Sequence, residues 1–342
     1  MQTGAAGWPL SLQTMALIAT GAAALCVLLI LALRPFLLRY ALARPNARSS
    51  HREPTPQGGG IAVIAATIVV TLIAAAGVPE LRAAALSALF AATILIAFVG
   101  MVDDIRPLPV APRLLLQALA VAVVITALPA DLRIVGFLPW WLERLLLLIA
   151  GLWFVNLVNF MDGLDWMTVA EVVPVTAALV LIGMDGALPP AAILVALALG
   201  GATLGFGYFN RPVARLFLGD VGSLPIGLLL GWLLVLLAGS GHFAAALLLP
   251  LYYLADATIT LGRRLAAGDR IWESHRRHFY QQATARGFTV KEVVSRVFFL
   301  NVMLALLAVM TVWVRSSLLS ASALAAGAAL VGLLLWVFHR GK

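Results

Sequence analysis

Residues 15–36, MALIATGAAALCVLLILALRPF, are the stretch that decides the fold. A membrane-spanning helix needs about 20 predominantly apolar residues, and this stretch has that length with Arg34 as its one charged side chain. The stretch is longer than the apolar core of a signal peptide, and no Lys or Arg precedes it. It therefore predicts a retained first span, with the N-terminus on the outer, periplasmic side.

The rest of the chain has a similar composition. Of the 342 residues 63% are hydrophobic and 11% are charged, whereas soluble domains carry about 25% charged residues. No polar stretch is long enough to build a separate soluble domain. Lipid offers no partners to exposed backbone amides, so the spans must be helices rather than strands. We therefore expect an all-α polytopic integral membrane protein, with residues 1–342 as a single domain.

Apolar windows recur along the whole chain, and we expect each to form one transmembrane helix. The eleven windows are residues 15–36, 60–77, 83–101, 113–128, 138–157, 168–184, 188–208, 222–239, 242–262, 296–314 and 317–338. With the N-terminus outside, 19 of the 23 Lys and Arg residues fall on the inner face and four on the outer face. This asymmetry follows the positive-inside rule and places the C-terminus in the cytoplasm.

The same asymmetry explains the net charge of +8 without a nucleic-acid partner, and we expect none. The single cysteine, Cys26, excludes a disulfide within the chain and a thiolate zinc site. The inner connections are longer than the outer ones and hold nearly all the polar clusters. We expect these inner loops to form the active site: about residues 37–59, 102–112, 158–167, 209–221 and 263–295.

Five of the fifteen acidic residues lie in three of these loops, at or just beyond the ends of spans: Asp103, Asp104, Asp162, Asp165 and Asp220. Carboxylates so close to hydrocarbon are costly unless they are paired or bound to cations. Solvated loop charge or a helix cap explains any one of them, but not the whole set. Oxygen ligands without a cysteine or paired-histidine motif suit Mg²⁺ or Mn²⁺ better than zinc.

The adjacent carboxylates of Asp103 and Asp104 repel each other unless a cation or a shared proton intervenes, so they are candidates for metal binding or general-base catalysis.

In NLVNFMDGLDWM the polar residues recur every third position. On a helix, Asn156, Asn159, Asp162 and Asp165 lie along one side and can line one polar wall, and we expect that helix to unwind at Gly163. The alternative is that the asparagines join neighbouring helices, which leaves the acids unexplained.

Two further loops carry candidate phosphate and nucleotide groups. Asp220 stands between Gly219 and Gly222, and glycines allow close approach of a phosphate to the backbone. Asn210 and Phe217 precede it and offer an amide and a stacking ring. The first loop supplies Arg48, His51 and Arg52, followed by the glycines at 58–60. We expect the glycine-rich entry to the second span to bind an anion.

The last inner loop groups four cationic or titratable side chains, His275, Arg276, Arg277 and His278. Arginine binds phosphate oxygens bidentately, and histidine moves protons or binds phosphate. The positive-inside rule, by which arginines gather on the cytoplasmic side of a membrane, explains the arginines but not the histidines.

Asp256 lies inside the ninth span, and an acid inside a membrane span is a candidate functional residue for that reason. The alternative is that Asp256 forms an ion pair with Arg263.

Taken together, these loops resemble the polyprenyl-phosphate N-acetylhexosamine-1-phosphate transferase family, glycosyltransferase family 4. The resemblance covers essentially the full length of the chain, and five strings carry it in the family's order: RSSHREPTPQGGG, GMVDDIRPLP, NLVNFMDGLDWM, FNRPVARLFLGDVGS and SHRRHFYQ. The last string is more similar to the branch that initiates O-antigen or other surface polysaccharides than to the peptidoglycan branch. His51 and Gln57 depart from the basic residues of related enzymes.

The resemblance implies transfer of N-acetylhexosamine-1-phosphate from a UDP-sugar to undecaprenyl phosphate, with release of UMP, at the cytoplasmic face of the bacterial inner membrane. It implies that Asp220 binds Mg²⁺, that Asp103 and Asp104 are the catalytic carboxylates near the lipid phosphate, and that Asp162 lies near the uridine and the metal; we add Asp162 to the catalytic candidates. The substrate-binding residues that it implies are Asn159, Asp165, Asn210, Phe217, His275, Arg277 and His278; to these we add His51, Asn156 and Arg276 as candidates.

Two other classes of protein are weighed against this reading. An intramembrane prenyltransferase also uses aspartate-rich Mg²⁺ sites, but it needs a second DxxD-type motif that this chain lacks. A transporter or lipid flippase places polar groups near the membrane midplane and often has internal repeats, and neither pattern is found. The donor sugar, a homodimer, and direct attack versus a covalent intermediate stay open.

Overall fold

The computed structural model describes residues 10–43, 54–77, 83–270 and 275–342. Within these ranges almost all regular structure is helical. The helices are α1 (Leu12–Tyr40), α2 (Gly59–Ala76), α3 (Ala83–Ile105), α4 (Val110–Thr126), α5 (Trp140–Met161), α6 (Met167–Met184), α7 (Pro190–Gly207), α8 (Asp220–Gly239), α9 (Phe243–Leu248), α10 (Leu251–Ala266), α11 (Phe279–Ala285), α12 (Val290–Val314) and α13 (Ser317–Arg340).

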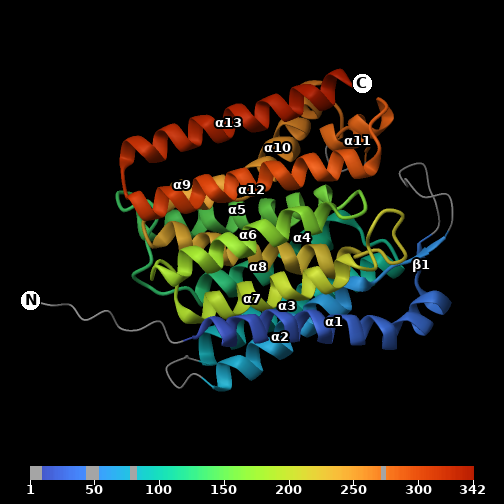
Figure 1. The fold of residues 1–342 in the computed structure, drawn as a ribbon, viewed down its shortest axis with the longest axis horizontal. Helices are drawn as coiled ribbons and strands as arrows, with labels where there is room; N and C mark the ends of the chain where they lie inside the picture. Colours follow the sequence, from blue (N-terminus) through green and yellow to red (C-terminus); the bar gives the residue numbers. More distant parts are fainter. Residues whose placement is uncertain (1–9, 44–53, 78–82, 271–274) are drawn as a thin grey trace, which may run out of the picture.

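The long helices pack side by side into one elongated bundle (Figure 1). Helices α7 and α8 are the most buried, whereas α1 and α13 lie near opposite sides of the bundle and expose most of their apolar surface. Such outward apolar surface is what lipid would cover. In the described part of the chain, nine helices are long and apolar enough to cross a membrane, and α4 is a shorter apolar helix. The all-α polytopic membrane fold is thus confirmed.

The ninth predicted span is not the continuous helix that its apolar window suggested. It is divided into α9 and α10 at Leu249 and Pro250. Proline lacks the amide hydrogen that a helix interior requires, so the break falls where this residue stands. The break leaves α10 as a separate helix that carries Asp256 near its middle.

A short sheet forms within the connection between α1 and α2, at one end of the bundle. Strand β1 (Leu42–Ala43) pairs antiparallel with β2 (Thr55–Pro56), with Leu42 opposite Pro56. The chain then forms a further bridge, in which Gln57 pairs with Phe217. In Figure 1, β1 and α11 lie at the right-hand end, whereas α9 and the turn between α12 and α13 lie at the left-hand end.

Candidate active site

The centre of the candidate site is the first turn of α8. The carboxylate of Asp104, in the last turn of α3, accepts hydrogen bonds from the backbone amides of Asp220 at 2.9 Å and Val221 at 3.1 Å. An anion is favoured at a helix N-terminus, where amides are unpaired, and disfavoured at a C-terminus. Asp104 lies at the C-terminus of α3, which is unfavourable for a negative charge. Its hydrogen bonds to the N-terminus of α8 compensate for this position.

Asp220 is held from a third helix. The side-chain amide of Asn159, in the last turn of α5, donates to Asp220 Oδ1 at 2.8 Å and to the hydroxyl of Ser223 at 2.9 Å. The carboxyl of Asp103 also lies within hydrogen-bonding reach of Asp220. The structure thus brings Asp220 together with two adjacent acids of α3 that precede it by more than 100 residues.

The two adjacent acids of α3 have different surroundings. Asp103 forms an ion pair with Arg113 at 2.7 Å and accepts the backbone amide of Leu108 at 2.6 Å. Asp104 accepts, besides the two α8 amides, the side-chain amide of Gln57 at 2.5 Å. The hydrogen bonds described for Asp104 therefore come from neutral donors, whereas Asp103 has a cationic neighbour.

The glycines at 58–60 have a packing role, and the expectation that they bind an anion is wrong. The amides of Gly58 and Gly59 donate to the carbonyl of Phe217, and that of Gly60 donates to Leu218. A Cβ at Gly60 would lie 2.2 Å from the Cα of Gly222, so α2 and α8 cross with no room for a side chain. The helix entry fixes the first loop to the fourth loop and has no amide left for a ligand.

Helix α5 ends at Met161, close to the unwinding expected at Gly163, so Asp165 is not on the helix and the four polar side chains do not form one helical wall. Asn156 is buried and donates to the side chain of Gln117 at 2.7 Å, which joins α5 to α4. Of the two asparagines, Asn159 is therefore the one that contacts the α8 carboxylate.

The segment after α5 is fastened to the fourth loop. Asp165 is buried and accepts the amide of Ala214 at 2.9 Å. Asn210 is buried as well; it accepts the amide of Trp166 at 2.7 Å and donates to the carbonyl of Leu216 at 2.9 Å. These contacts position the backbone on both sides of the site.

Asp162 directly follows α5 and accepts a hydrogen bond from the hydroxyl of Thr168. Burial raises the pKa of the Asp162 carboxyl to about 7, and the negative charges of Asp104 and Asp165 add to the increase, while the Thr168 hydrogen bond opposes it. A carboxyl with such a pKa exchanges a proton near neutral pH, as a general base or acid must.

The last inner loop is anchored by Asp256, which is fully buried in α10. Its carboxylate lies 3.2 Å from Nδ1 of the buried His278 and accepts the backbone amides of Phe279 at 3.0 Å and Tyr280 at 3.2 Å. The alternative pairing of Asp256 with Arg263 is therefore wrong: the Arg263 guanidinium lies over the ring of Phe279.

The loop then reaches the end of α5. The His275 and His278 rings are stacked with centroids 4.8 Å apart, and the hydroxyl of Tyr280 donates to the carbonyl of Phe160 at 2.9 Å. A Cβ at Gly163 would lie 2.1 Å from that hydroxyl, so the glycine permits this contact. His278 thus lies close to the segment that carries Asp162.

The remaining predicted residues lie nearer the surface or outside the described residues. Arg276 and Arg277 are exposed, and Arg277 pairs with Asp269. Phe217 is half-buried beside Gln57. His51, together with Arg48 and Arg52, lies outside the described residues.

Sequence reasoning missed four residues that support the site: Gln57, Ser223, Thr168 and Tyr280. The sequence positions of two of them could have indicated a role at the site. Ser223 is three residues after Asp220 and so shares its helix face, and Gln57 directly precedes the glycine run.

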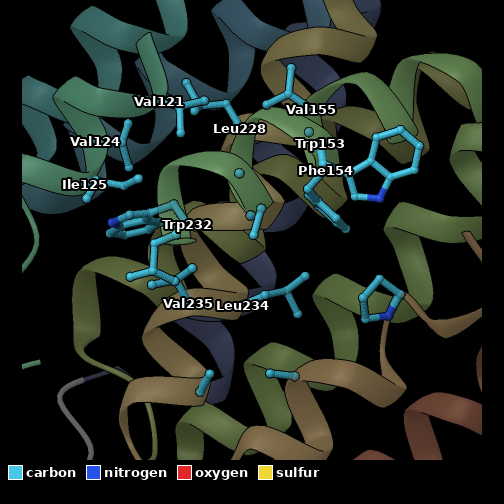
Figure 2. Close-up of a pocket in the computed structure, with 18 of the residues that line it drawn as sticks. Val121, Val124, Ile125, Trp153, Phe154, Val155, Leu228, Trp232, Leu234 and Val235 are labelled. Atoms are coloured by element: carbon cyan, nitrogen blue, oxygen red, sulfur yellow. The ribbon is translucent and has the colours of Figure 1, made fainter. Parts of the chain in front are cut away.

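An apolar groove approaches this site along the bundle. It has a volume of about 250 Å³ and lies among α4, α5, α8, α9 and α10. Figure 2 shows Val121, Phe154, Leu228, Trp232 and Val235 around it. Its α8 side begins at Gly227, seven residues after Asp220, which is about 10 Å along the helix axis. The groove therefore starts about two turns from Asp220 and extends along α8 as far as Ala238, toward the opposite end of the bundle.

Comparison with known proteins gives these features a context. Residues 86–238 match the model of glycosyl transferase family 4. A decaprenyl-phosphate N-acetylglucosaminephosphotransferase of Mycobacterium leprae is 29% identical over 295 residues, 75% of this chain and 73% of the relative. A probable undecaprenyl-phosphate N-acetylglucosaminyl 1-phosphate transferase of Bacillus subtilis is 24% identical over 84% of each chain. A phospho-N-acetylmuramoyl-pentapeptide-transferase of Lactiplantibacillus plantarum is 30% identical over 58% of this chain and 70% of the relative.

The fold, the acid cluster and these similarities define a membrane-embedded phosphoglycosyltransferase. The chain belongs to glycosyl transferase family 4, in the group of polyprenyl-phosphate N-acetylhexosamine-1-phosphate transferases. Because the chain belongs to this family, we exclude the alternative hypotheses that it is a prenyltransferase or a transporter.

Proposed function

We propose that the protein transfers N-acetylhexosamine-1-phosphate from a UDP-sugar to undecaprenyl phosphate and releases UMP. The observation that carries the proposal is the position of Asp104 and Asp220 at the start of α8, where the Asp104 carboxylate accepts the Asp220 amide, about 10 Å along the helix from the apolar groove. The names of the relatives, which include decaprenyl-phosphate and undecaprenyl-phosphate transferases, support a polyprenyl phosphate as the acceptor.

The groove suits the tail of such an acceptor. Its lining is almost entirely aliphatic and aromatic, so burying isoprene units there removes apolar surface from water or from weaker lipid contacts. A lipid that lies in the groove would present its phosphate at the carboxylate end. This placement accounts for a site at the membrane surface rather than at its midplane.

The donor's pyrophosphate requires a counter-charge beside the acids. The oxygen donors of Asp220 and Asp104 fit Mg²⁺, which proteins hold with one or two carboxylates together with substrate phosphates. Within the described ranges no three acidic, histidine or cysteine side chains are arranged to hold a metal by themselves. Asp220 would hold the ion, and the chemistry supplied there is neutralisation of pyrophosphate charge. Mn²⁺ could take the same place.

In the proposed reaction an oxygen of the acceptor phosphate attacks the phosphorus that bears the sugar. The bond from that phosphorus to the bridging oxygen breaks, and UMP leaves with the electron pair. Phosphoryl transfer needs positioning and charge neutralisation more than covalent chemistry by the protein. Asp162, with its pKa of about 7, is suited to hold or take a proton. His275, His278, Arg276 and Arg277 would balance phosphate charge.

The proposal places this site at the cytoplasmic face of a bacterial inner membrane. The inner loops then contain 19 of the 23 Lys and Arg residues. The sequence of the last inner loop favours a role in starting O-antigen or another surface polysaccharide.

The experiment uses the purified full-length protein with Mg²⁺, undecaprenyl phosphate and a panel of UDP-N-acetylhexosamines, and it measures UMP release and the mass of the lipid product. We expect one donor to give a product heavier by one N-acetylhexosamine phosphate. Asp220→Asn should abolish release, whereas Asp131→Asn, an exposed acid in the connection between α4 and α5, should not. Absence of release with every donor would contradict the proposal.

A further inference from the structure

A polar pocket lies at the opposite end of the bundle from the carboxylates. It has a volume of about 310 Å³, and its lining includes Gly241, His242, Arg315, Ser316, Ser317 and Ser320. These residues belong to the turn between α8 and α9, to the turn between α12 and α13, and to the first turn of α13. Because α8 has 20 residues, the pocket is about 30 Å along that helix from Asp220. We call it the α12–α13 pocket.

The side chains of this pocket are those that bind phosphate oxygens. Arg315 contributes a guanidinium, His242 an imidazole, and the three serines contribute hydroxyl groups. The pocket also lies at the N-terminus of α13, a helix of 24 residues whose dipole favours an anion there. The pKa of His242 is lowered, first by burial and then by the charge of Arg315, so the two groups lie within electrostatic reach of each other.

The backbone of Arg315 is a further feature of this pocket. Its φ of +50° is in the left-handed region, where glycine is preferred at the end of a helix. Among the described residues only Trp166 is another non-glycine residue with positive φ. An arginine in this conformation is uncommon at a helix end.

The rim of the pocket is apolar and exposed. Phe243 is 52% exposed, Trp313 58% and Leu318 79%, and each lies within two residues of a pocket-lining residue. A tryptophan and aliphatic side chains beside a cationic pocket match the level of lipid head groups. We propose that the α12–α13 pocket binds a phosphate group, presented by the head group of an anionic lipid or by free phosphate.

Asp185 is the internal competitor for this ligand. Its carboxylate lies 3.3 Å from the Arg315 guanidinium, and both side chains are exposed, at 40% and 67%. Such an exposed ion pair is weak, so a phosphate group that also receives hydrogen bonds from serines can displace it. Removing the Asp185 charge should therefore strengthen binding.

The experiment uses the full-length protein in neutral detergent, with phosphatidylglycerol as probe and diacylglycerol as a lipid without phosphate. Native mass spectrometry measures the retained lipid. Relative to wild type, Arg315→Gln should lower phosphatidylglycerol retention by at least about 5-fold, and Asp185→Asn should raise it. Arg340→Gln, at the other end of α13, is the matched control and should leave retention unchanged. Wild type and the three variants have the same apolar groove, so lipid retained there contributes equally to all four and does not affect the comparison.

A second arm uses inorganic phosphate alone and measures the Tm. A rise for wild type that Arg315→Gln abolishes identifies free phosphate as a ligand, and retention of phosphatidylglycerol without such a rise identifies the lipid. If Arg315→Gln does not fold, the Ser317→Ala/Ser320→Ala double variant replaces it and should also lower retention. Equal retention by all variants, with no effect of phosphate on Tm, would overturn the proposal and leave Arg315 as a helix end paired with Asp185.

Discussion

The carboxylate of Asp104 caps the helix that begins with Asp220: its oxygens lie 2.9 Å and 3.1 Å from the first two amides of α8. One candidate catalytic acid thus fixes the position of the other through the backbone. This arrangement gives Asp104 a structural task as well as a chemical one, and variants can separate the two.

Asp104→Asn keeps a side-chain oxygen that can accept an α8 amide, while Asp104→Ala loses the cap. We expect both to lower turnover by at least about 100-fold, because each removes a charge aimed at the reacting groups. The alanine variant should also lose about 1 kcal/mol of stability through the lost cap, visible as a lower Tm. An asparagine variant with normal turnover would reduce Asp104 to a cap.

The two asparagines of α5 form a matched pair, three residues apart on one helix. Asn159→Ala should lower turnover by at least about 10-fold, because Asp220 loses its amide donor. Asn156→Ala should leave turnover nearly unchanged and lower the Tm, because it leaves the buried side chain of Gln117 without its partner, at a cost of about 1–3 kcal/mol. Steady-state kinetics and thermal unfolding of both variants decide the assignment; reversed effects would contradict it.

Asp256 is a positioning residue for His278 in this structure. If it acts through that histidine, Asp256→Asn and His278→Ala should each lower kcat, and the double variant should be no worse than the more severe single variant. Arg263→Ala is the control, since that side chain does not pair with Asp256. Independent, multiplied losses would show that Asp256 serves only the fold of the loop.

The raised pKa of Asp162 predicts two pH effects. As a base, Asp162 should give an activity that rises as pH increases through about 7, and Asp162→Asn should lack this limb. For stability the sign is opposite. The folded protein binds the proton more tightly than the unfolded chain, so the stability contributed by this group is complete below pH about 4 and is lost as pH rises to about 7.

Thermal unfolding without divalent ions measures the second effect. Wild type should lose Tm relative to Asp162→Asn between pH 4 and pH 7. A constant difference between the two proteins across this range would show that the carboxyl titrates normally.

The sequence predicted the helices well because long apolar segments have one stable form in lipid. It also selected the acids that meet at α8, since Asp103, Asp104 and Asp220 are costly where they stand. It failed where a partner is distant in the chain. Asp256 contacts the amides of a loop 23 residues later, and Gln57 contacts Asp104 across 47 residues.

The role of the glycines at 58–60 also depends on residues that are distant in the chain. A run of three glycines before a helix is compatible with an anion site and with a close helix crossing. Only the carbonyls of Phe217 and Leu218, and the Cα of Gly222, decide between them. No pattern within the first loop contains that information.

Seven residues along α8 separate Asp220 from Gly227, where the groove begins. This spacing fixes how the carboxylate and the proposed site of the lipid tail are placed relative to each other. Seven residues make almost two full helical turns, so the carboxylate and the groove share nearly one face of α8. One inserted or deleted residue between them would rotate the groove away by about 100°. Substitutions can alter which isoprenoid or sugar is preferred, but the length of this segment is fixed by geometry, and we expect evolution to vary its side chains and not its spacing.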